Sequence, residues 1–455
     1  MIMFLNKILG SSLKTFELGG VHPEENKLSA NEPIQDLPLP KSVTIPIAQH
    51  IGLPAKPVVD KKDKVKVGQV IAQSEGFVSA NIHSSVSGMV TKVDVAIDAS
   101  GYKKLAISIR VKDDEWEEGI DRTADLKSEI IDTPEQIREK ILKAGIVGLG
   151  GATFPSHVKL SVPKGKKVEV LLINGVECEP YLTADHRLML ENGPQVLVGI
   201  KILMKALSVE KAIIGIENNK SDAIKALKTL TANEGGISVQ PLKTQYPQGG
   251  EKQLIKACLN REVPSGGLPL DVGAVVHNVG TAFAVYEAVQ KNKPLIERVV
   301  TVTGSSVEKP ANYRVRIGTP VKELTEAAGG VPEDTGKIVS GGPMMGKAIA
   351  DLGVPVTKGT SGILMIPEKD SHRDETISCI RCGKCVTVCP MGLEPYLLLT
   401  LSQKQFYDRA EQEKVMDCIE CGSCSYMCPS SQPILDYIRL GKSKVGKIIK
   451  ERQKR

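Results

Sequence analysis

The N-terminal part of the chain is a series of short apolar runs. Residues 42–48, 67–72 and 105–111 combine β-branched and other apolar residues with polar ones, and Gly, Pro and Asp separate the runs. Short runs of this kind between turn residues are typical of strands in an all-β module. The pattern therefore predicts a β-rich module over residues 1–115.

The next predicted element is a helix with a clear start and stop. Thr133 and Gln136 have the spacing of a capping box, and Pro134 takes the first helical position. An apolar stripe of helical period follows, and Gly145 ends it. We expect an amphipathic helix that leads into the glycine-rich stretch behind it.

Apolar runs of strand length then alternate with helical patterns. The strand runs cover residues 168–173, 211–216 and 237–242, and the helical patterns cover 197–207 and 221–230. Strand alternating with helix predicts a parallel sheet covered on both faces, with its ligand loops at the carboxyl ends of the strands. We expect this α/β domain over residues 130–298.

The pattern changes again near residue 299. Short strand-like runs cover 299–303 and 312–317, and a helical pattern follows Pro320. These elements predict a separate, small α+β domain over residues 299–367. The expected fold class is therefore a multidomain α/β and α+β protein.

The C-terminal part combines cysteines with helical patterns. Pro395 stands where a first helical turn begins, and leucine-rich residues follow it. We expect a cysteine-bearing domain over residues 372–440 and a basic tail over residues 441–455. The tail interleaves lysines with Val445 and Ile448, so it either contacts acidic lipid or a partner or remains solvated.

Composition narrows the class of protein. A formal charge of +6 and 41% hydrophobic residues fit a soluble globular protein, and neither disorder nor nucleic-acid binding follows from them. No apolar run approaches the roughly 18 residues needed to span a bilayer, and residues 1–10 lack a signal-peptide core. We therefore expect a cytoplasmic or peripheral protein.

The cysteines carry the strongest chemical signal. Two runs of C-x2-C-x2-C-x3-C-P contain Cys379, Cys382, Cys385, Cys389, Cys418, Cys421, Cys424 and Cys428. This spacing is typical of proteins with two [4Fe–4S] clusters, in which the fourth cysteine of each run binds the other cluster. We therefore assign Cys428 to the first cluster and Cys389 to the second. Structural zinc and disulfides are the alternatives, and two complete runs closed by proline argue against both.

A glycine-rich loop offers a phosphate site. Residues 148–155 supply small residues and backbone N–H groups, and Lys159 adds a cation. The segment 174–180 follows a predicted strand and carries two carboxylates that could accept hydrogen bonds from ribose or ribityl hydroxyls. An ordinary glycine loop and solvated acids are the alternative reading. Two clusters exchange single electrons, so another cofactor must fill and drain them, and we expect the sheet domain to supply it.

These segments together resemble a known family. Residues 148–159, 174–180, 246–251 and 277–281 look like the flavin mononucleotide (FMN) and NADH site of the complex I flavoprotein subunit. With the paired cysteine runs and the opening Gly-Gly-Val-His-Pro at 19–23, the whole chain resembles the RnfC family, which belongs to the Rnf complex, the ion-translocating ferredoxin:NAD⁺ oxidoreductase. The family implies a flavin domain, then a β-grasp domain, then a helical two-cluster ferredoxin domain.

The N-terminal module resembles a second fold. Residues 67–90 are similar to the hybrid barrel of biotinyl and lipoyl carriers. The tip position where a carrier places its lysine falls near Phe77. We therefore expect a structural, hybrid-barrel-like module and not a swinging-arm carrier.

The resemblance to the flavoprotein implies site residues. Those implied around the flavin phosphate are Gly148, Gly150, Gly151 and Lys159, those lining the flavin are Asn174, Glu177, Tyr246, Gly249, Asn278 and Thr281, and those facing the nicotinamide nucleotide are Phe154, Glu179 and Glu251. The chain departs from the pattern at Leu149, Val176 and Gly250, where complex I has arginine, aspartate and glutamate. Leu268 falls near its adenine-stacking phenylalanine. No catalytic acid or base is implied.

The resemblance also implies a function and a location. The chain would be a peripheral subunit on the cytoplasmic face of the cell membrane, exchanging electrons between NAD(H), FMN and two [4Fe–4S] clusters in either direction. Its partners would be the other subunits of the membrane redox complex and, through them, ferredoxin; no nucleic acid is expected. Two alternatives remain, a soluble flavin and iron–sulfur reductase of the cobalamin-reductase type and a flavin-free iron–sulfur relay adaptor.

Overall fold

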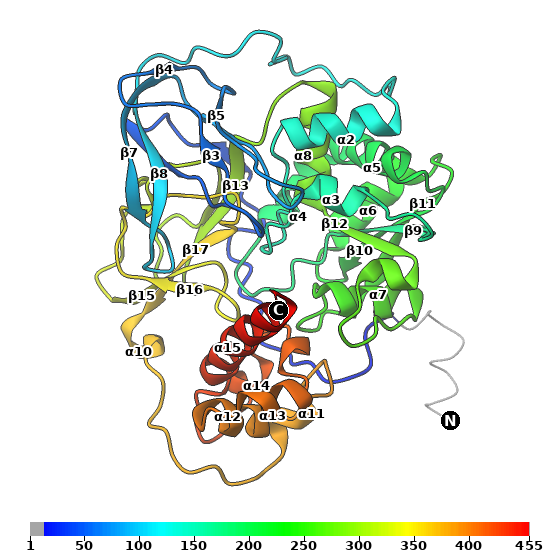
Figure 1. Cartoon of the computed structure of the whole chain (residues 1–455), viewed down its shortest axis with the longest axis vertical. Helices are drawn as coiled ribbons and strands as arrows, with labels where there is room; N and C mark the ends of the chain where they lie inside the picture. The colour runs from blue at the N-terminus through cyan, green and yellow to red at the C-terminus, as the bar shows by residue number, and fades with distance from the viewer. Residues whose placement is uncertain (1–12, 455) are drawn as a thin grey trace.

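The chain is a multidomain α/β protein with one parallel sheet, one mixed sheet and a helical end. A computed structural model describes residues 13–454, so the expectation for residues 1–10 and the tail residue Arg455 lie outside the described residues. Figure 1 shows a β-module in blue and cyan beside a helix-covered green sheet, with a yellow sheet below the module and orange and red helices at the lower end.

The N-terminal module consists of two antiparallel sheets. One has the order β2 (Ser42–Pro46), β8 (Lys103–Val111), β7 (Gly88–Ile97) and β4 (Lys64–Val65), and the other has β3 (Lys56–Pro57), β5 (Val70–Gln73) and β6 (Ile82–His83). Alternate residues such as Ile45 and Ile107 are fully buried between them. The strands predicted at 42–48 and 105–111 are confirmed, whereas the run at 67–72 enters a strand only at Val70.

The middle sheet has four parallel strands in the order β11, β10, β9 and β12. Its strands are β9 (Val170–Asn174), β10 (Ala212–Glu217), β11 (Ile237–Leu242) and β12 (Ala274–Asn278). Its helices are α2 (Pro134–Lys143), α3 (Ser156–Leu160), α4 (Ala184–Glu191), α5 (Gly193–Leu207), α6 (Ser221–Thr231), α7 (Glu251–Leu259), the 3-10 turn η1 (Pro269–Val272) and α8 (Val279–Gln290). The parallel sheet and the Thr133 capping box are confirmed. Sequence analysis missed β12, the strand that completes the rim of the site.

The third sheet draws strands from distant parts of the chain. Its order is β1 (Ile34–Asp36), β14 (Ala311–Arg316), β13 (Glu297–Thr303), β17 (Gly362–Pro367), β15 (Thr335–Ser340) and β16 (Lys347–Ile349), with α9 (Val321–Ala327) and α10 (Glu368–Ser371) beside it. β1 pairs in parallel with β14, so the N-terminal segment adds an edge strand here. The pattern of residues 34–36 alone could not predict a partner almost 280 residues away.

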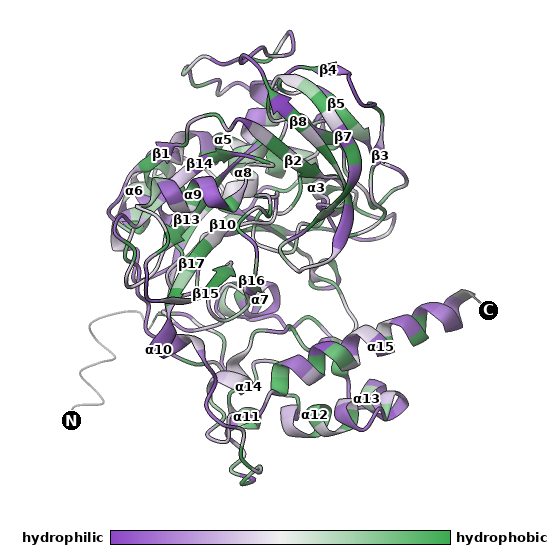
Figure 2. Cartoon of the chain, turned by 90° about the vertical axis from the view of Figure 1, so that its left-hand side faces the viewer, coloured by the Kyte–Doolittle hydropathy of each residue, from purple (hydrophilic) through white to green (hydrophobic). Residues whose placement is uncertain are grey.

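The C-terminal end is helical. It comprises α11 (Lys384–Thr387), α12 (Pro395–Gln403), α13 (Tyr407–Gln412), the 3-10 turn η2 (Val415–Asp417), α14 (Ser423–Tyr426) and α15 (Ile434–Lys454). Pro395 begins α12, as predicted. The expected basic tail is, over residues 441–454, the continuation of α15, and Val445 of this helix is buried among the neighbouring helices. Figure 2 shows green and purple residues alternating along this projecting helix.

Within residues 13–454, no helix is both long and apolar enough to cross a membrane.

Candidate functional site

The carboxyl ends of two neighbouring strands bring three predicted segments together. Asn174 ends β9 and Asn278 ends β12, and the two residues are paired in register. The Asn174 side-chain amide donates to the carbonyl of Gly249 at 2.9 Å. The Asn278 side-chain oxygen accepts from the N–H groups of Gly280 (2.8 Å) and Thr281 (3.4 Å), so it caps α8. Segments 174–180, 246–251 and 277–281 therefore share one rim.

The glycine loop is fastened to the same rim. Gly148 N–H donates to the carbonyl of Phe154 at 2.8 Å and closes the loop. Leu149 N–H donates to Thr281 Oγ1 at 2.9 Å, which ties the loop to the N-terminus of α8. Because the backbone of Leu149 makes this contact, the contact does not depend on the side chain at this position.

Two glycines leave the loop open to a ligand. A Cβ on Gly150 would lie 3.4 Å from the Asn278 Cβ, so the loop runs close to α8. Gly151 has φ +106°, and no atom lies within 4 Å of where its Cβ would be. The backbone at Gly151 therefore has the conformation that favours glycine and free space beside it, as close approach of a phosphate requires.

The predicted phosphate cation lies at the rim in an ion pair. Lys159 Nζ is 2.7 Å from Glu251 Oε1 and donates to the carbonyl of Val276 at 3.0 Å. Both side chains are partly exposed, so a ligand phosphate could compete for the lysine. His277 lies beside it, and burial, together with the charge of Lys159, lowers its pKa to about 3. The imidazole of His277 is therefore neutral, and Lys159 is the cation at this part of the rim.

Glu177 is held by the start of a helix. Its two carboxylate oxygens accept from the N–H groups of Asp185 (2.8 Å) and His186 (3.1 Å) in the first turn of α4. Asp185 in turn accepts from the Asn278 side-chain amide at 2.6 Å. Burial, with the nearby charge of Glu177, raises the pKa of Asp185 to about 7. Sequence analysis missed Asp185, because its partners Glu177 and Asn278 come from two separate segments.

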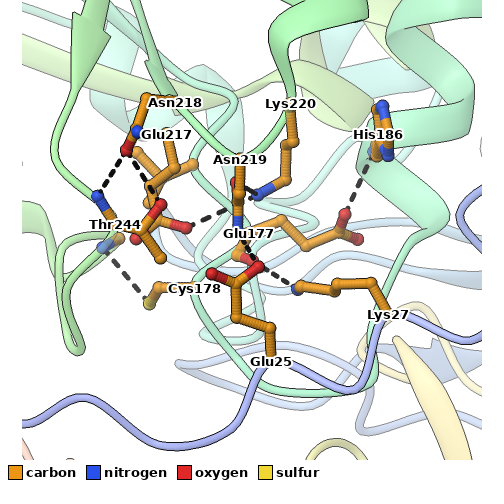
Figure 3. A network of polar contacts seen from close by, with 12 residues as sticks. Glu25, Lys27, Glu177, Cys178, His186, Glu217, Asn218, Asn219, Lys220 and Thr244 are labelled. Carbon is orange, nitrogen blue, oxygen red and sulfur yellow. Dashed lines mark hydrogen bonds and ion pairs between the residues drawn. The ribbon is translucent and has the colours of Figure 1, made fainter.

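A lysine from the N-terminal segment fixes the loop that carries Glu177. Lys27 Nζ donates to the carbonyls of Glu177 (2.9 Å), Glu179 (2.8 Å) and Leu182 (2.7 Å). Burial lowers the pKa of Lys27 to about 8. Figure 3 shows this side chain reaching the loop from the blue segment. A single lysine in an irregular stretch gives no sequence signal for such a role.

A second buried lysine lies at the end of β10. Lys220 donates to Asn219 Oδ1 at 2.9 Å and lies 3.5 Å from Glu217, and both charged side chains are only 2% exposed. Asn219 also donates to Glu25 at 2.9 Å, so the network reaches the N-terminal segment (Figure 3). The charged pair joins the end of β10 to the loop after it, and the bond from Asn219 to Glu25 joins this loop to the N-terminal segment.

Glu179 lies at a domain contact. Its carboxylate accepts from the N–H groups of Met344 (3.2 Å) and Met345 (2.8 Å), which lie between β15 and β16 of the third sheet. Burial raises its pKa to about 7. The neighbouring Cys178 thiol accepts from Gly249 N–H at 3.3 Å, and burial raises its pKa, so it packs as a neutral side chain. Of the three residues expected at the nicotinamide nucleotide, Glu179 thus already has two protein partners.

Cys385 and Cys424 each have thiol neighbours from both cysteine runs, and these neighbours are the residues that the predicted crossed ligation names. Burial raises the pKa of Cys385, and the neighbouring thiols of Cys428 and Cys379 add to the effect. Burial raises the pKa of Cys424 to about 12, and its thiol neighbours are Cys421, Cys418 and Cys389. Within residues 13–454, no three side chains of the ligand-forming types could share a single metal ion. A cubane cluster does not need such a group, since each thiolate binds its own iron.

The two cysteine runs have the same backbone. Arg381 and Glu420 have φ of +56° and +57°, and Gly383 and Gly422 have φ of +73° and +80°. Each glycine precedes a short helix, α11 or α14, that carries the third cysteine. The two runs therefore share one loop conformation around their second and third cysteines.

The surroundings of the two sets differ. Cys379 and Cys382 are exposed, whereas Cys421 is buried against Val21 and Tyr246. The Tyr246 hydroxyl donates to the carbonyl of Cys421 at 2.7 Å. The set around Cys418 therefore lies against the sheet domain, and the set around Cys379 lies at the surface.

Helix α15 completes the buried set. Lys442 Nζ donates to the carbonyl of Cys418 at 2.7 Å and lies 2.9 Å from Glu420 Oε1. Arg439 lies 3.1 Å from Glu420 Oε2. Lys442, at the start of the expected basic tail, and Arg439, which precedes it, thus supply two cations beside the second cysteine run.

Comparison with known families divides the chain in the same order. Residues 14–115 match the RnfC barrel sandwich hybrid domain, and residues 141–287 match the Nuo51 FMN-binding domain. Residues 299–348 match the SLBB domain, and residues 371–429 match a 4Fe-4S dicluster domain.

Similar proteins cover nearly the whole chain. The C subunit of the proton-translocating ferredoxin:NAD(+) oxidoreductase complex of Clostridium ljungdahlii is 51% identical over 88% of this chain and 87% of its own length. The C subunit of the Na(+)-translocating ferredoxin:NAD(+) oxidoreductase complex of Acetobacterium woodii is 45% identical over 94% and 96%. A chain of the NAD+-reducing [NiFe]-hydrogenase in the H2-reduced state has a TM-score of 0.47 at 18% identity, covering 69% of this chain and 63% of that one. The chain belongs to the RnfC family, whose members are part of the ion-translocating ferredoxin:NAD(+) oxidoreductase complexes.

Proposed function

We propose that this chain is the electron-transfer subunit of an ion-translocating membrane redox complex. It exchanges electrons between NAD(H), FMN and two [4Fe–4S] clusters in ferredoxin:NAD⁺ oxidoreduction, and the other subunits of the complex are its partners. Membership of the RnfC family and the matches to FMN-binding and dicluster domains support this function. Peripheral attachment at the cytoplasmic face of the membrane is part of the proposal.

One observation carries the proposal. The Tyr246 hydroxyl donates to the carbonyl of Cys421 at 2.7 Å, so the rim segment 246–251 touches the buried cysteine set directly. An FMN at the rim and a cluster on these cysteines would be neighbours across this contact. Electron exchange between two cofactors requires such proximity, and the contact lies in an apolar cluster that also includes Val21 and Cys178.

The residues at the rim fit FMN. Gly148, Gly150, Gly151 and Lys159 would hold its phosphate, and Asn174, Glu177, Tyr246, Gly249, Asn278 and Thr281 would surround the rest. The open space at Gly151 and the rim position of Lys159 support the phosphate end. When bound, FMN accepts an electron pair as hydride and releases electrons one at a time. The contribution of the chain is binding and orientation, since Glu177 and Asn278 are already fixed by α4 and α8.

NAD(H) would bind over the same rim. Phe154 and Glu251 are partly exposed beside the glycine loop, which supports their contact with the nucleotide. Glu179 would contribute indirectly, because its carboxylate holds the backbone N–H groups of Met344 and Met345. We further propose a hybrid barrel over residues 1–115, a β-grasp domain over 299–367 and a ferredoxin domain over 372–440, in keeping with the family matches.

Anaerobic purification tests the function. We expect FMN, and about eight irons for two cubane clusters, with cluster absorbance that NADH bleaches. Gly150→Val should abolish FMN binding and NADH bleaching, while dithionite still reduces the clusters. Lys159→Ala should weaken FMN binding about tenfold to hundredfold by removing a charge-assisted contact.

Two substitutions serve as controls. Gly235→Val adds the same bulk where no atom lies within 4 Å, and Lys164→Ala removes an exposed cation outside the rim. Both should retain FMN. A parent protein with clusters but no FMN would be the relay adaptor instead. Unchanged bleaching in Gly150→Val would mean that the electrons enter elsewhere.

A further inference from the structure

The tip of the N-terminal module lies against the glycine loop. Ile51 N–H donates to the carbonyl of Thr153 at 3.4 Å. On the other tip loop, the Phe77 carbonyl lies 3.0 Å from His157 Nε2. Thr153 and His157 flank Phe154 and the start of α3, so a ligand that reaches Phe154 also meets this tip.

Three apolar side chains of the tip are exposed there. The exposed fractions are 52% for Ile51, 59% for Leu53 and 64% for Phe77. Among the described residues, Phe77 and Phe406 are the two phenylalanines that are more than half exposed, and of these two Phe77 is the one beside the proposed site. The Phe77 ring meets His157 edge-on, at 86° and 6.2 Å between centroids, which leaves ring surface open to another planar group.

The tip is rigid. Leu53 N–H donates to the carbonyl of Val78 at 3.0 Å, and the Ser79 hydroxyl donates to the carbonyl of Leu53 at 2.9 Å. A Cβ on Gly52 would collide with the Val78 carbonyl, so the two tip loops touch. The loop that carries Phe77 is therefore held in place, and a ligand would spend little conformational entropy in ordering its backbone.

We infer that Phe77, flanked by Ile51 and Leu53, forms a stacking wall for the adenine ring of NAD(H). The inference rests on the proposed function. A dinucleotide with its nicotinamide at the rim must extend its adenosine half along the protein surface, and the tip offers apolar, aromatic surface next to Phe154. Every base has a π-face that can stack on an exposed aromatic side chain. In biotinyl and lipoyl carriers, the corresponding tip holds the prosthetic group. In this chain the tip would present an aromatic ring to the nucleotide.

A pair of substrates separates adenine stacking from other effects. NADH carries the adenine, whereas reduced nicotinamide mononucleotide lacks it. In the full-length protein with its cofactors, Phe77→Ala should raise the KM for NADH about 5- to 150-fold and leave the KM for the mononucleotide unchanged. Binding of ADP-ribose, measured by calorimetry, should weaken by the same factor, and Phe77→Trp should restore both.

The control is Phe406→Ala, which removes another exposed phenylalanine, 57% exposed, next to α13. It should change neither KM. The inference is wrong if Phe77→Ala leaves NADH and ADP-ribose binding unchanged, if it affects both substrates equally, or if it impairs only assembly with the other subunits of the complex. If NADH does not reduce the parent protein, both the proposed function and this inference are wrong. If NADH reduces the parent protein and the Phe77 variant behaves like it, only the inference about Phe77 is wrong.

Discussion

The two cysteine sets share one local backbone conformation but differ in their surroundings. Both have paired positive φ values before a short helix, and both end in Cys-Pro. Yet Cys379 and Cys382 are exposed, whereas Cys421 and Cys424 are buried against the sheet domain and α15. Local spacing thus determines the ligand loop, and tertiary contacts determine what the loop faces.

This difference has chemical consequences. Cluster potentials depend on solvent exposure and on hydrogen bonds near the sulfurs. The buried set has Lys442 on the Cys418 carbonyl and Tyr246 on that of Cys421, whereas the first cysteines of the other set face solvent. We expect two clusters of different potential, with the exposed one accessible to the other subunits of the complex.

Ligand replacement should have the largest effect. Cys385→Ser should damage the exposed cluster and Cys424→Ser the buried one, because each removes a thiolate from one set only. Iron should fall from about eight to about four per chain in each variant. Iron analysis and electron paramagnetic resonance after dithionite reduction measure this. Loss of both clusters from either variant would contradict independent sets.

Gly383 and Gly422 occupy matching positions in the two cysteine runs, so replacing each of them tests the effect of its surroundings. Gly383→Ala should cost about 1–2 kcal/mol, because its φ is +73° but no atom lies within 4 Å of the new Cβ. Gly422→Ala should cost about 1–3 kcal/mol more, because its Cβ would lie 2.8 Å from the carbonyl oxygen of Met344. Thermal bleaching of cluster absorbance measures the difference. Equal losses would mean that the Met344 contact does not constrain the buried set.

Sequence reasoning predicted what is local. The capping box at Thr133, the strands of the parallel sheet and the helix start at Pro395 follow from short patterns. The cysteine spacing predicts two ligand loops on the same local basis, and the two runs share one backbone conformation. Resemblance added Asn174 and Asn278, which the structure brings together on one rim.

What sequence reasoning missed is non-local. β1 pairs with β14 across the chain, and Lys27 reaches three carbonyls of a loop about 150 residues away. The role of Lys442 was hidden because a run of basic residues is typical of a solvated tail. No window of sequence contains both partners of such contacts.

The protonation state of Glu179 should affect the stability of the Met344–Met345 segment, which lies beside the buried cysteine set. Burial raises its pKa from 4.5 to about 7, so the native state holds this proton more tightly than the unfolded state does. The resulting stabilisation is full below about pH 4.5 and is lost as the pH rises through about 7, by roughly 1–3 kcal/mol. Glu179→Gln should abolish this pH dependence. Hydrogen exchange of the Met344 and Met345 amides, which bind the carboxylate, measures it at pH 5 and pH 8.

A matched control keeps that test specific. Glu394→Gln changes an exposed carboxylate beside the other cysteine set, where it accepts from the Tyr396 hydroxyl. It should leave the exchange of Met344 and Met345 unchanged at both pH values. A pH dependence that persists in Glu179→Gln would place the titrating group elsewhere.

The smallest expected effect comes from a single hydroxyl. Tyr246→Phe removes the hydrogen bond to the Cys421 carbonyl, which is worth about 1 kcal/mol, while the ring still packs beside Val21. For a one-electron couple this corresponds to a shift of at most about 40 mV in the potential of the buried cluster. The exposed cluster should not shift. Tyr396→Phe is the control, because its hydroxyl bonds to the exposed Glu394 at 3.0 Å and not to a cysteine carbonyl. Potentiometric titration of both clusters would contradict the proposed contact if Tyr246→Phe moved neither potential, or moved both equally.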